Sequence, residues 1–397
     1  MVSATSSRSP VRDEPGPDRP GSSGTTAPAD RTRPVDLAKP AASESAPGPG
    51  GRAAPPGTVP ARRSHRPAVL TLGLLGLLVV LAALTWASLV NGSGPAGAAD
   101  VRDALFAKDL TQHGQLIVWE VRIPRTIAGL LAGLALGLAG AVMQGVARNP
   151  LADPGILGVN AGAAVAVVLA ITLLGLNSAN QYIWFGFLGA LLASVMVYGI
   201  GSLGRDGATP VKLALAGAAT SAVLGSITTA VLLTDSRTFD HYRFWQVGSL
   251  TARDADVLWL AGPFIFFGAV VALGLGSSLN ALALGDDLAR ALGQQVGRAR
   301  LGAAAAVVLL CGSATVVAGP IAFLGLIVPH AVRTFTGPDY RWVLPYSALA
   351  APALLLTADL VGRFLASPGE VQVGVVTAAI GCVPFVLLVR RHRLAEL

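Results

Sequence analysis

The segment Val121–Ala163 reads VRIPRTIAGLLAGLALGLAGAVMQGVARNPLADPGILGVNAGA and is the most informative stretch of the chain. A run rich in glycine and alanine begins after Arg122 and Arg125, and it is long enough to cross a bilayer, which takes roughly 20 apolar residues. The run ends in the turn Arg148–Pro154, and a second apolar run follows at once. The stretch therefore predicts two consecutive membrane helices. The arginine pair at the entrance of the first helix suggests a docking surface.

The composition is that of an integral membrane protein. Of the 397 residues, 53% are hydrophobic and only 13% are charged, whereas soluble domains carry about 25% charged residues. The net charge of +7 would suggest nucleic acid binding in a soluble protein, but arginines flanking membrane helices on the cytoplasmic side explain it better. We therefore expect no nucleic-acid partner. Cys311 and Cys382 lie within apolar runs and offer neither a disulfide framework nor metal-ligand spacing.

Residues 1–66 differ in character from the rest of the chain. They contain 12 of the 26 prolines, mixed charges and no apolar periodicity, so they cannot bury enough surface to offset their ordering entropy. We predict a disordered cytoplasmic tail over 1–66 and a transmembrane domain over 67–397. The alternative, a signal peptide cleaved near Ala96–Ala98, would need an n-region of 66 residues. A retained membrane anchor is therefore favoured.

Ten apolar segments after residue 66 predict an all-α polytopic membrane protein. If the chain starts inside, cationic residues are more frequent in the cytoplasmic connections than in the outer ones, so both termini are predicted to be cytoplasmic. The eighth segment is short and contains Pro329, His330 and Arg333, which predicts a broken or partly buried helix. The ten segments are 67–90, 124–147, 155–175, 182–203, 211–233, 255–276, 299–318, 322–336, 342–362 and 371–390.

Small and polar residues within these segments predict helix packing and an internal path. Gly129, Gly133 and Gly137 recur every four residues, and such small residues let helix backbones approach each other in lipid. Gln144 and Asn160 are polar and lie within predicted spans. Because intramembrane polar groups usually face protein or water, we expect both to face a cavity.

Residues arranged for covalent chemistry are absent from the sequence. None of the three lysines, Lys39, Lys108 and Lys212, lies in the phosphate-binding pattern G-x-x-x-x-G-K-[ST]. The five histidines are scattered, and the sequence contains no H-E-x-x-H pattern. We therefore expect a chain that is not an enzyme, does not hydrolyse ATP itself and binds no cofactor or metal.

The largest predicted cytoplasmic loop, about 279–298, contains ALALGDDLARALG. Leu284, Leu288 and Leu292 recur at four-residue spacing with charged residues between them, which predicts a short amphipathic helix at the membrane surface. Taken alone, this pattern fits a helix that merely covers the bundle equally well.

Four ordered blocks of sequence resemble the FecCD-type permeases, which import iron–siderophores, haem and cobalamin with ABC ATPases. One departure is clear, because Gln372 stands where the family usually has a proline. This change leaves the geometry of the last outward turn open, although not the fold. The four blocks are RNPLADPG at 148–155, WQVGSL at 245–250, GPIAFLGLIVPHAVR at 319–333 and GVVTAAIG at 374–381.

The resemblance implies a type II ABC importer permease in the cell membrane, with a substrate path at the centre of a dimer. Its implied partners are two ABC ATPase subunits, an extracytoplasmic substrate-binding protein and a second permease, either identical or homologous. The cytoplasmic end of the path would be narrowed by Asn149 and Leu151. Binding-protein docking would fall to Arg122, Arg125 and Arg363, although the first two could instead extend their charged ends to the membrane interface. Contacts with the ATPase would be made by Leu282, Gly285, Asp286, Ala289, Leu292 and Gly293.

Ferric siderophores are the expected substrate, because RNPLADPG and WQVGSL are more similar to siderophore permeases than to the cobalamin permease. Haem and cobalamin stay open as alternatives. An ion-coupled secondary transporter is a different class, and acidic residues should mark its ion site, but only Asp359 lies well inside a span. A membrane scaffold would need neither the amphipathic loop nor the outer arginines.

Overall fold

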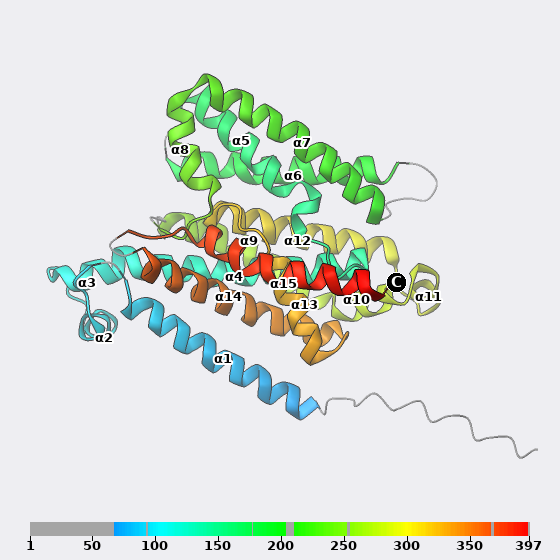
Figure 1. Ribbon diagram of the computed structural model, residues 1–397, viewed down its shortest axis with the longest axis horizontal. Helices are drawn as coiled ribbons and strands as arrows, with labels where there is room; N and C mark the ends of the chain where they lie inside the picture. The colour runs from blue at the N-terminus through cyan, green and yellow to red at the C-terminus, as the bar shows by residue number, and fades with distance from the viewer. Residues whose placement is uncertain are drawn as a thin grey trace, which may run out of the picture. The chain divides into compact units, whose positions relative to one another are not determined.

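The computed structural model describes residues 67–92, 94–176, 178–203, 210–251, 255–366 and 369–395. Throughout these ranges the regular structure is helical, with no strand (Figure 1). The tail predicted over 1–66 lies outside the described residues. The all-α polytopic architecture that the sequence predicts is confirmed.

Each predicted span coincides with a helix in the described part of the chain. Seven helical segments there are long and apolar enough to cross a membrane, and Val159–Leu174 and Val373–Val383 are shorter apolar helices. The ten helices are α1 (Pro67–Val90), α4 (Ile123–Ala147), α5 (Val159–Leu174), α6 (Ala179–Gly201), α7 (Pro210–Thr234), α9 (Ala255–Gly274), α12 (Val296–Ala318), α13 (Leu324–Thr336), α14 (Tyr340–Leu365) and α15 (Val373–Ala395).

Short helices join these ten at both ends of the bundle. We call the two ends the α2 end and the α11 end, after the short helices that lie there (Figure 1). The short elements are α2 (Ala98–Phe106), α3 (His113–Ile117), a π-helical turn η1 (Val118–Arg122), a 3-10 turn η2 (Pro154–Leu157), α8 (Ser236–Gln246), α10 (Gly276–Ala283) and α11 (Asp286–Ala291).

Helix α4 lies at the centre of the bundle, between α14 on one side and α12 on the other (Figure 1). Its glycine repeat faces α14: a methyl group at Gly133 would overlap Pro352, and one at Gly137 would overlap the Ser347 carbonyl. Another glycine, Gly140, lies against the backbone of Gly325 in α13. The predicted role of the small residues in close helix packing is therefore confirmed.

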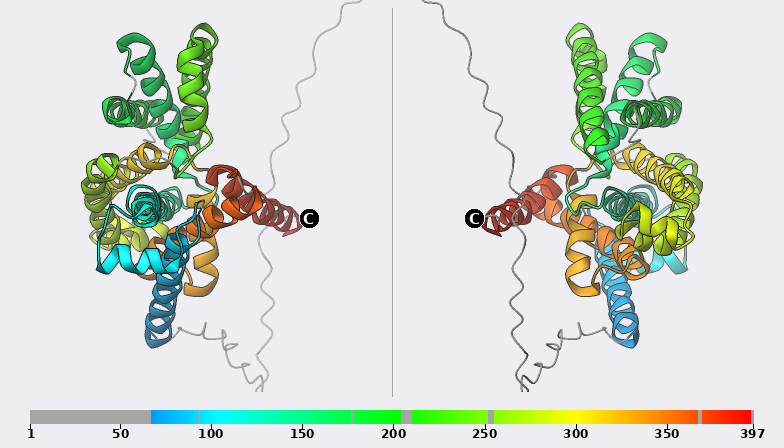
Figure 2. Two further views of the ribbon diagram at one scale, coloured as in Figure 1. Left: turned by 90° about the vertical axis from the view of Figure 1, so that its left-hand side faces the viewer. Right: turned by 90° about the vertical axis from the view of Figure 1, so that its right-hand side faces the viewer.

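Helices α5 to α8 form a group beside α12, on the side away from α14 (Figures 1 and 2). Within the group α5 and α6 pack closely, because Gly162 and Gly189 face each other without side chains between them. On the opposite side α1 packs mainly against α14, and the Tyr346 hydroxyl donates a 2.6 Å hydrogen bond to the Leu70 carbonyl. Most apolar side chains of α1 are exposed, as expected for a helix that faces lipid.

The eighth span is short, as the sequence predicts. Helix α13 begins after Phe323, whose φ of 65° is left-handed, and it contains Pro329. A proline has no N–H, so the carbonyl four residues earlier, that of Gly325, loses its helical partner. The Gln144 amide of α4 compensates by donating to the Leu326 carbonyl at 2.9 Å and to the Gly325 carbonyl at 3.4 Å. The helix is continuous through Pro329, and protein covers the carbonyl that the proline leaves without a helical partner.

Candidate functional site

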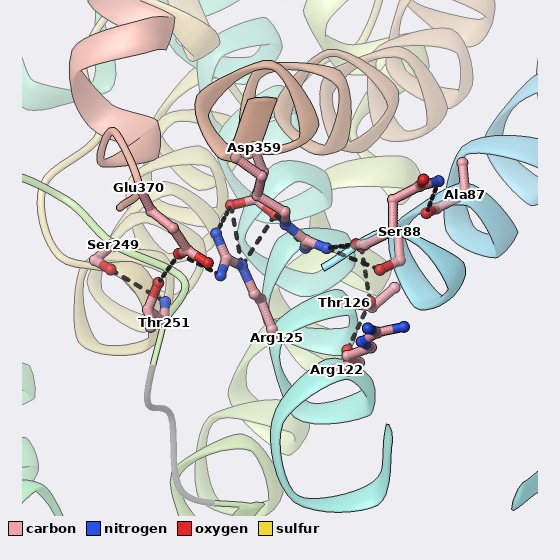
Figure 3. A network of polar contacts seen from close by, with 11 residues as sticks. Ala87, Ser88, Arg122, Arg125, Thr126, Ser249, Thr251, Asp359 and Glu370 are labelled. Carbon is pink, nitrogen blue, oxygen red and sulfur yellow. Dashed lines mark hydrogen bonds and ion pairs between the residues drawn. The ribbon is translucent and has the colours of Figure 1, made fainter. Parts of the chain in front are cut away.

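The α2 end contains a buried network of ions centred on Asp359 of α14 (Figure 3). The Arg125 guanidinium of α4 donates hydrogen bonds of 2.7–3.2 Å to this carboxylate and one of 2.6 Å to Glu370. Arg363, one turn after Asp359, pairs with the same carboxylate. Thr251, before α9, donates to Glu370 at 3.3 Å. Two cations and two anions therefore balance in a site where unpaired charge would be costly.

Two arginines of this region cap the end of α1. The last carbonyls of a helix have no helical partner, and a cation there also complements the helix dipole. Arg122 donates to the carbonyls of Leu89, Val90 and Ala96 at 2.7–2.9 Å. Arg363 donates to the Ser88 carbonyl at 2.9 Å. The end of α1 is thus attached to both η1 and α14.

The arginines predicted to dock a binding protein are all buried. Arg122, Arg125 and Arg363 are 2%, 6% and 7% exposed, and each uses its guanidinium within the chain. They do not extend to the interface either. This geometry supports a structural role at the α2 end, and docking stays a prediction. For Arg125 the burial was not visible in the sequence, because its partners Asp359 and Glu370 lie more than 230 residues away.

Three of the sequence blocks converge at one point beside this network. The Ser249 N–H donates to the Ala318 carbonyl at 2.7 Å, and the Gly374 N–H donates to the Gly248 carbonyl at 3.1 Å. Gly248, with a φ of 78°, lies against the Pro320 carbonyl, where a side chain would not fit. The turn with Gln372 is also ordered here, since its carbonyl accepts from the Val375 N–H at 3.0 Å. The turn is therefore formed with Gln372 at this position.

At the α11 end, the predicted amphipathic segment forms α10 and α11. Two glycines with positive φ bracket α11: Gly285 at 109° and Gly293 at 81°. Few other residues adopt such angles without strain. Leu284, Leu288 and Leu292 are 59%, 48% and 59% exposed. We call these three exposed apolar side chains the leucine ridge; exposed apolar surface of this kind often marks contact sites.

The residues predicted to touch an ATPase are divided between surface and interior. Leu282 and Ala289 are buried, at 1% and 0% exposure, so their side chains support the segment from within rather than present a surface. Leu292 and Gly293 are exposed, and Gly285 is half-buried. The prediction omitted Leu284 and Leu288, which the structure exposes, although their four-residue spacing is visible in the sequence. Asp286 is half-buried and pairs with arginines.

The turn between α4 and α5 lies next to α11. It begins at Arg148, whose φ of 51° is left-handed and unusual for a residue with a side chain. Within the turn the Asn149 side chain accepts from the Leu151 N–H at 2.9 Å. Asp153 accepts from the Gly155 N–H at 2.7 Å. Burial raises the pKa of the Asp153 carboxyl, and that hydrogen bond opposes the rise.

A cavity of about 70 Å³ opens between this turn and helices α6, α7 and α12. Its lining is mostly apolar and includes Asn149, Tyr198 and Arg300. Of the four residues predicted for the path, Asn149 therefore faces a cavity, and Leu151 is half-buried in the same turn. Gln144 instead bonds to α13, as described above. The Asn160 side chain was also predicted to face a cavity. It instead accepts a 2.8 Å hydrogen bond from the Thr315 hydroxyl and so links α5 to α12.

The described residues contain no cluster of three or more His, Cys, Asp or Glu side chains suited to a metal ion. What the chain offers is a polytopic helical bundle, a cavity and an exposed leucine ridge at one end. These features are those of a polytopic membrane protein.

The chain belongs to the FecCD transport family, whose match covers residues 78–391. It is 47% identical over 324 residues to the ferric enterobactin transport system permease protein FepD of Escherichia coli (strain K12), covering 82% of this chain and 96% of that protein. It is 41% identical over 318 residues to the probable siderophore transport system permease protein YfiZ of Bacillus subtilis (strain 168), covering 80% and 95%. Haemin and cobalamin permeases are also among its relatives.

A solved structure agrees with this assignment. It is a metal-chelate type ABC transporter in an inward-facing conformation, with a TM-score of 0.70 and 26% identity. The match covers 81% of this chain and 99% of that one. The predicted family and permease fold are therefore confirmed.

Proposed function

We propose that this chain is the permease subunit of an ABC importer that moves ferric siderophores into the cell. The observation that carries the proposal is the 47% identity to the ferric enterobactin permease, spread over 96% of that protein. The structure supports it with a helical bundle in the described residues of the matched region, 78–391.

The proposed division of labour follows from what the chain contains. The chain provides the path for the substrate and the contact surfaces for its partners, and a separate ABC ATPase hydrolyses ATP. The leucine ridge of α10–α11 offers this ATPase an apolar contact on the cytoplasmic side. The two ATPases would drive alternating access through a pair of permeases, and an extracytoplasmic binding protein would deliver the siderophore. In this arrangement both termini are cytoplasmic and the chain lies in the cell membrane.

The ion network counts against a secondary transporter. A coupling-ion site needs a carboxylate that is available to the ion. Asp359, the acidic residue well inside a span, is engaged by Arg125 and Arg363 at the same time. An ATP-driven importer needs no such site.

Uptake of radioactive iron tests the proposal directly. Cells lacking this chain, and the same cells supplied with it again, would be given iron-55 as ferric enterobactin or as a ferric hydroxamate, beside labelled cobalamin and haem. We expect siderophore iron uptake to depend on the chain while cobalamin uptake does not. Loss of cobalamin or haem uptake alone would keep the transport class and change the cargo. Uptake unaffected for all of them, in cells without a redundant importer, would overturn the proposal.

A further inference from the structure

A single carboxylate joins three elements at the α11 end. Asp286, the first residue of α11, pairs with Arg148 at the start of the α4–α5 turn. It also accepts hydrogen bonds of 2.9 and 3.1 Å from Arg300 near the start of α12. Arg290, one turn later in α11, lies 3.9 Å from it. No other carboxylate of α10–α11 in the described chain has ion pairs to elements outside that segment.

Two of the elements joined in this way, the α4–α5 turn and α12, line the cavity described above. Arg300 lines that cavity, and so does Asn149, the neighbour of Arg148. Arg148 itself is held in a left-handed conformation that residues with side chains rarely adopt. Such conformations persist when the surrounding contacts impose them, and they concentrate at functional sites. The contact with Asp286 is one that would impose it.

On this basis we propose that Asp286 is a positioning residue that transmits movement of α11 to the α4–α5 turn. The inference rests on the proposed function, because the ATPase would be what displaces α11 through the leucine ridge. While Asp286 holds Arg148 and Arg300, the turn and α12 stay in place around the cavity. When α11 moves, the same carboxylate moves the turn, so the cavity changes shape with the state of the ATPase.

The role given to Asp286 differs from the docking contact predicted from the sequence. Asp286 points to arginines of its own chain, and its side chain is 26% exposed. The neighbouring Asp287 is fully exposed at 103% and pairs with Arg290 within the same helix at 2.9 Å. The two aspartates therefore allow a matched comparison. Replacing Asp286 with asparagine removes the charge that holds Arg148 and Arg300, whereas the same change at Asp287 leaves those contacts intact.

The test compares Asp286→Asn with Asp287→Asn in the complete importer, reconstituted with its ATPase and binding protein. The readout is ferric siderophore transported per ATP hydrolysed. For Asp286→Asn we expect this ratio to fall about tenfold, within the range of ordinary coupling between sites, while ATPase association and basal hydrolysis persist. Asp287→Asn should match the wild type. Equal ratios for the two variants, or loss of ATPase association in Asp286→Asn, would overturn the proposal.

Arg148→Asn provides a second, independent variant. Asparagine tolerates the left-handed conformation, so the turn can keep its shape while the guanidinium is lost. Because both groups act through one contact, the double variant Arg148→Asn, Asp286→Asn should be no worse than either single variant. Additive losses would show that the two residues act separately.

A distance measurement tests the role of Asp286 even if the cargo is not a siderophore. Spin labels at Leu151→Cys and Ala291→Cys, with Cys382→Ser to remove the exposed thiol, report on the turn and on α11. In the full chain, Asp286→Asn should broaden the distribution of distances between them, and Asp287→Asn should not. An unchanged distribution would overturn the inference, whereas absent siderophore transport by the wild type would overturn only the proposed function.

Discussion

The Arg125 guanidinium holds the Asp359 carboxylate through three hydrogen bonds of 2.7–3.2 Å, although 234 residues separate the two in the sequence. Both side chains are almost completely buried, at 7% and 2% exposure. The pair fastens α4 to α14 at the α2 end, and Glu370 extends it to the segment before α15. Helices α4 and α14, the second and ninth predicted spans, are thus held together by ion pairs as well as by the close packing of small residues.

Replacing Asp359 with asparagine should destabilise the protein strongly. The change leaves Arg125 and Arg363 buried with Glu370 as the one remaining anion of the network, and breaking a buried pair typically costs about 3–5 kcal/mol. Thermal unfolding in detergent would measure this loss. The control is Asp103→Asn, which removes an exposed pair with Arg102 and should cost less than about 1 kcal/mol. Similar stability of the two variants would contradict the network.

Replacing Arg122 with glutamine separates the structural role from the docking role. Loss of its guanidinium leaves three carbonyls near the end of α1 without their partner, which should cost about 1–3 kcal/mol. We expect a lower unfolding temperature and, in the fraction that stays folded, unchanged salt dependence of binding-protein association. An association that became slower and less salt-dependent, at normal stability, would instead restore the docking prediction.

Leu288→Glu should weaken binding of the ATPase while leaving insertion intact. Leu288 is 48% exposed at the centre of the leucine ridge, and burying a leucine contributes roughly 1.5–3 kcal/mol, equivalent to tenfold or more in affinity. Co-purification of the ATPase with this chain measures the effect. Leu288→Met keeps the apolar area and serves as the control. Normal co-purification of Leu288→Glu would exclude the ridge as the contact.

Gly140→Ala should disrupt the crossing of α4 and α13. A methyl group there would collide with the Gly325 carbonyl, and overpacking of this kind costs about 1–3 kcal/mol or more. Gly76→Ala in α1 makes the same chemical change where nothing lies within 4 Å. We expect reduced yield and thermal stability for the first variant and normal values for the second. Equal tolerance would contradict the close approach of the two helices.

The fold was largely predictable from the sequence, because its main signals are local. Apolar runs of sufficient length correspond to helices, and the repeat of Gly129, Gly133 and Gly137 correctly indicated a packed face. The short eighth span was visible from Pro329. The sequence did not show that Gln144 would hydrogen-bond to the carbonyls of α13, because only the tertiary fold brings α4 and α13 together. The sequence therefore predicted the elements, but not which of their polar groups pair.

The site residues were harder to predict for the same reason. Four-residue spacing revealed the leucine ridge, yet family resemblance favoured Leu282 and Ala289, which the structure buries. A sequence position near a helix entrance cannot distinguish an exposed arginine from one that caps a distant helix. The partners of Arg122 lie about 30 residues earlier, and those of Arg125 lie 234 and 245 residues later.

The attachment of α1 has a consequence for how the protein is made. This helix precedes the other described helices in the chain, but Arg363, which binds its Ser88 carbonyl, follows 275 residues later. Chains are made from the N-terminus at about 5–20 residues per second, so α1 must remain in the bilayer for tens of seconds without its main neighbour, α14. The surface of α1 is almost entirely apolar, so the helix is stable in lipid before α14 is present. Of the helices that the structure describes, α1 is thus synthesised before the others but completes its contacts at the α2 end only after α14 has been made.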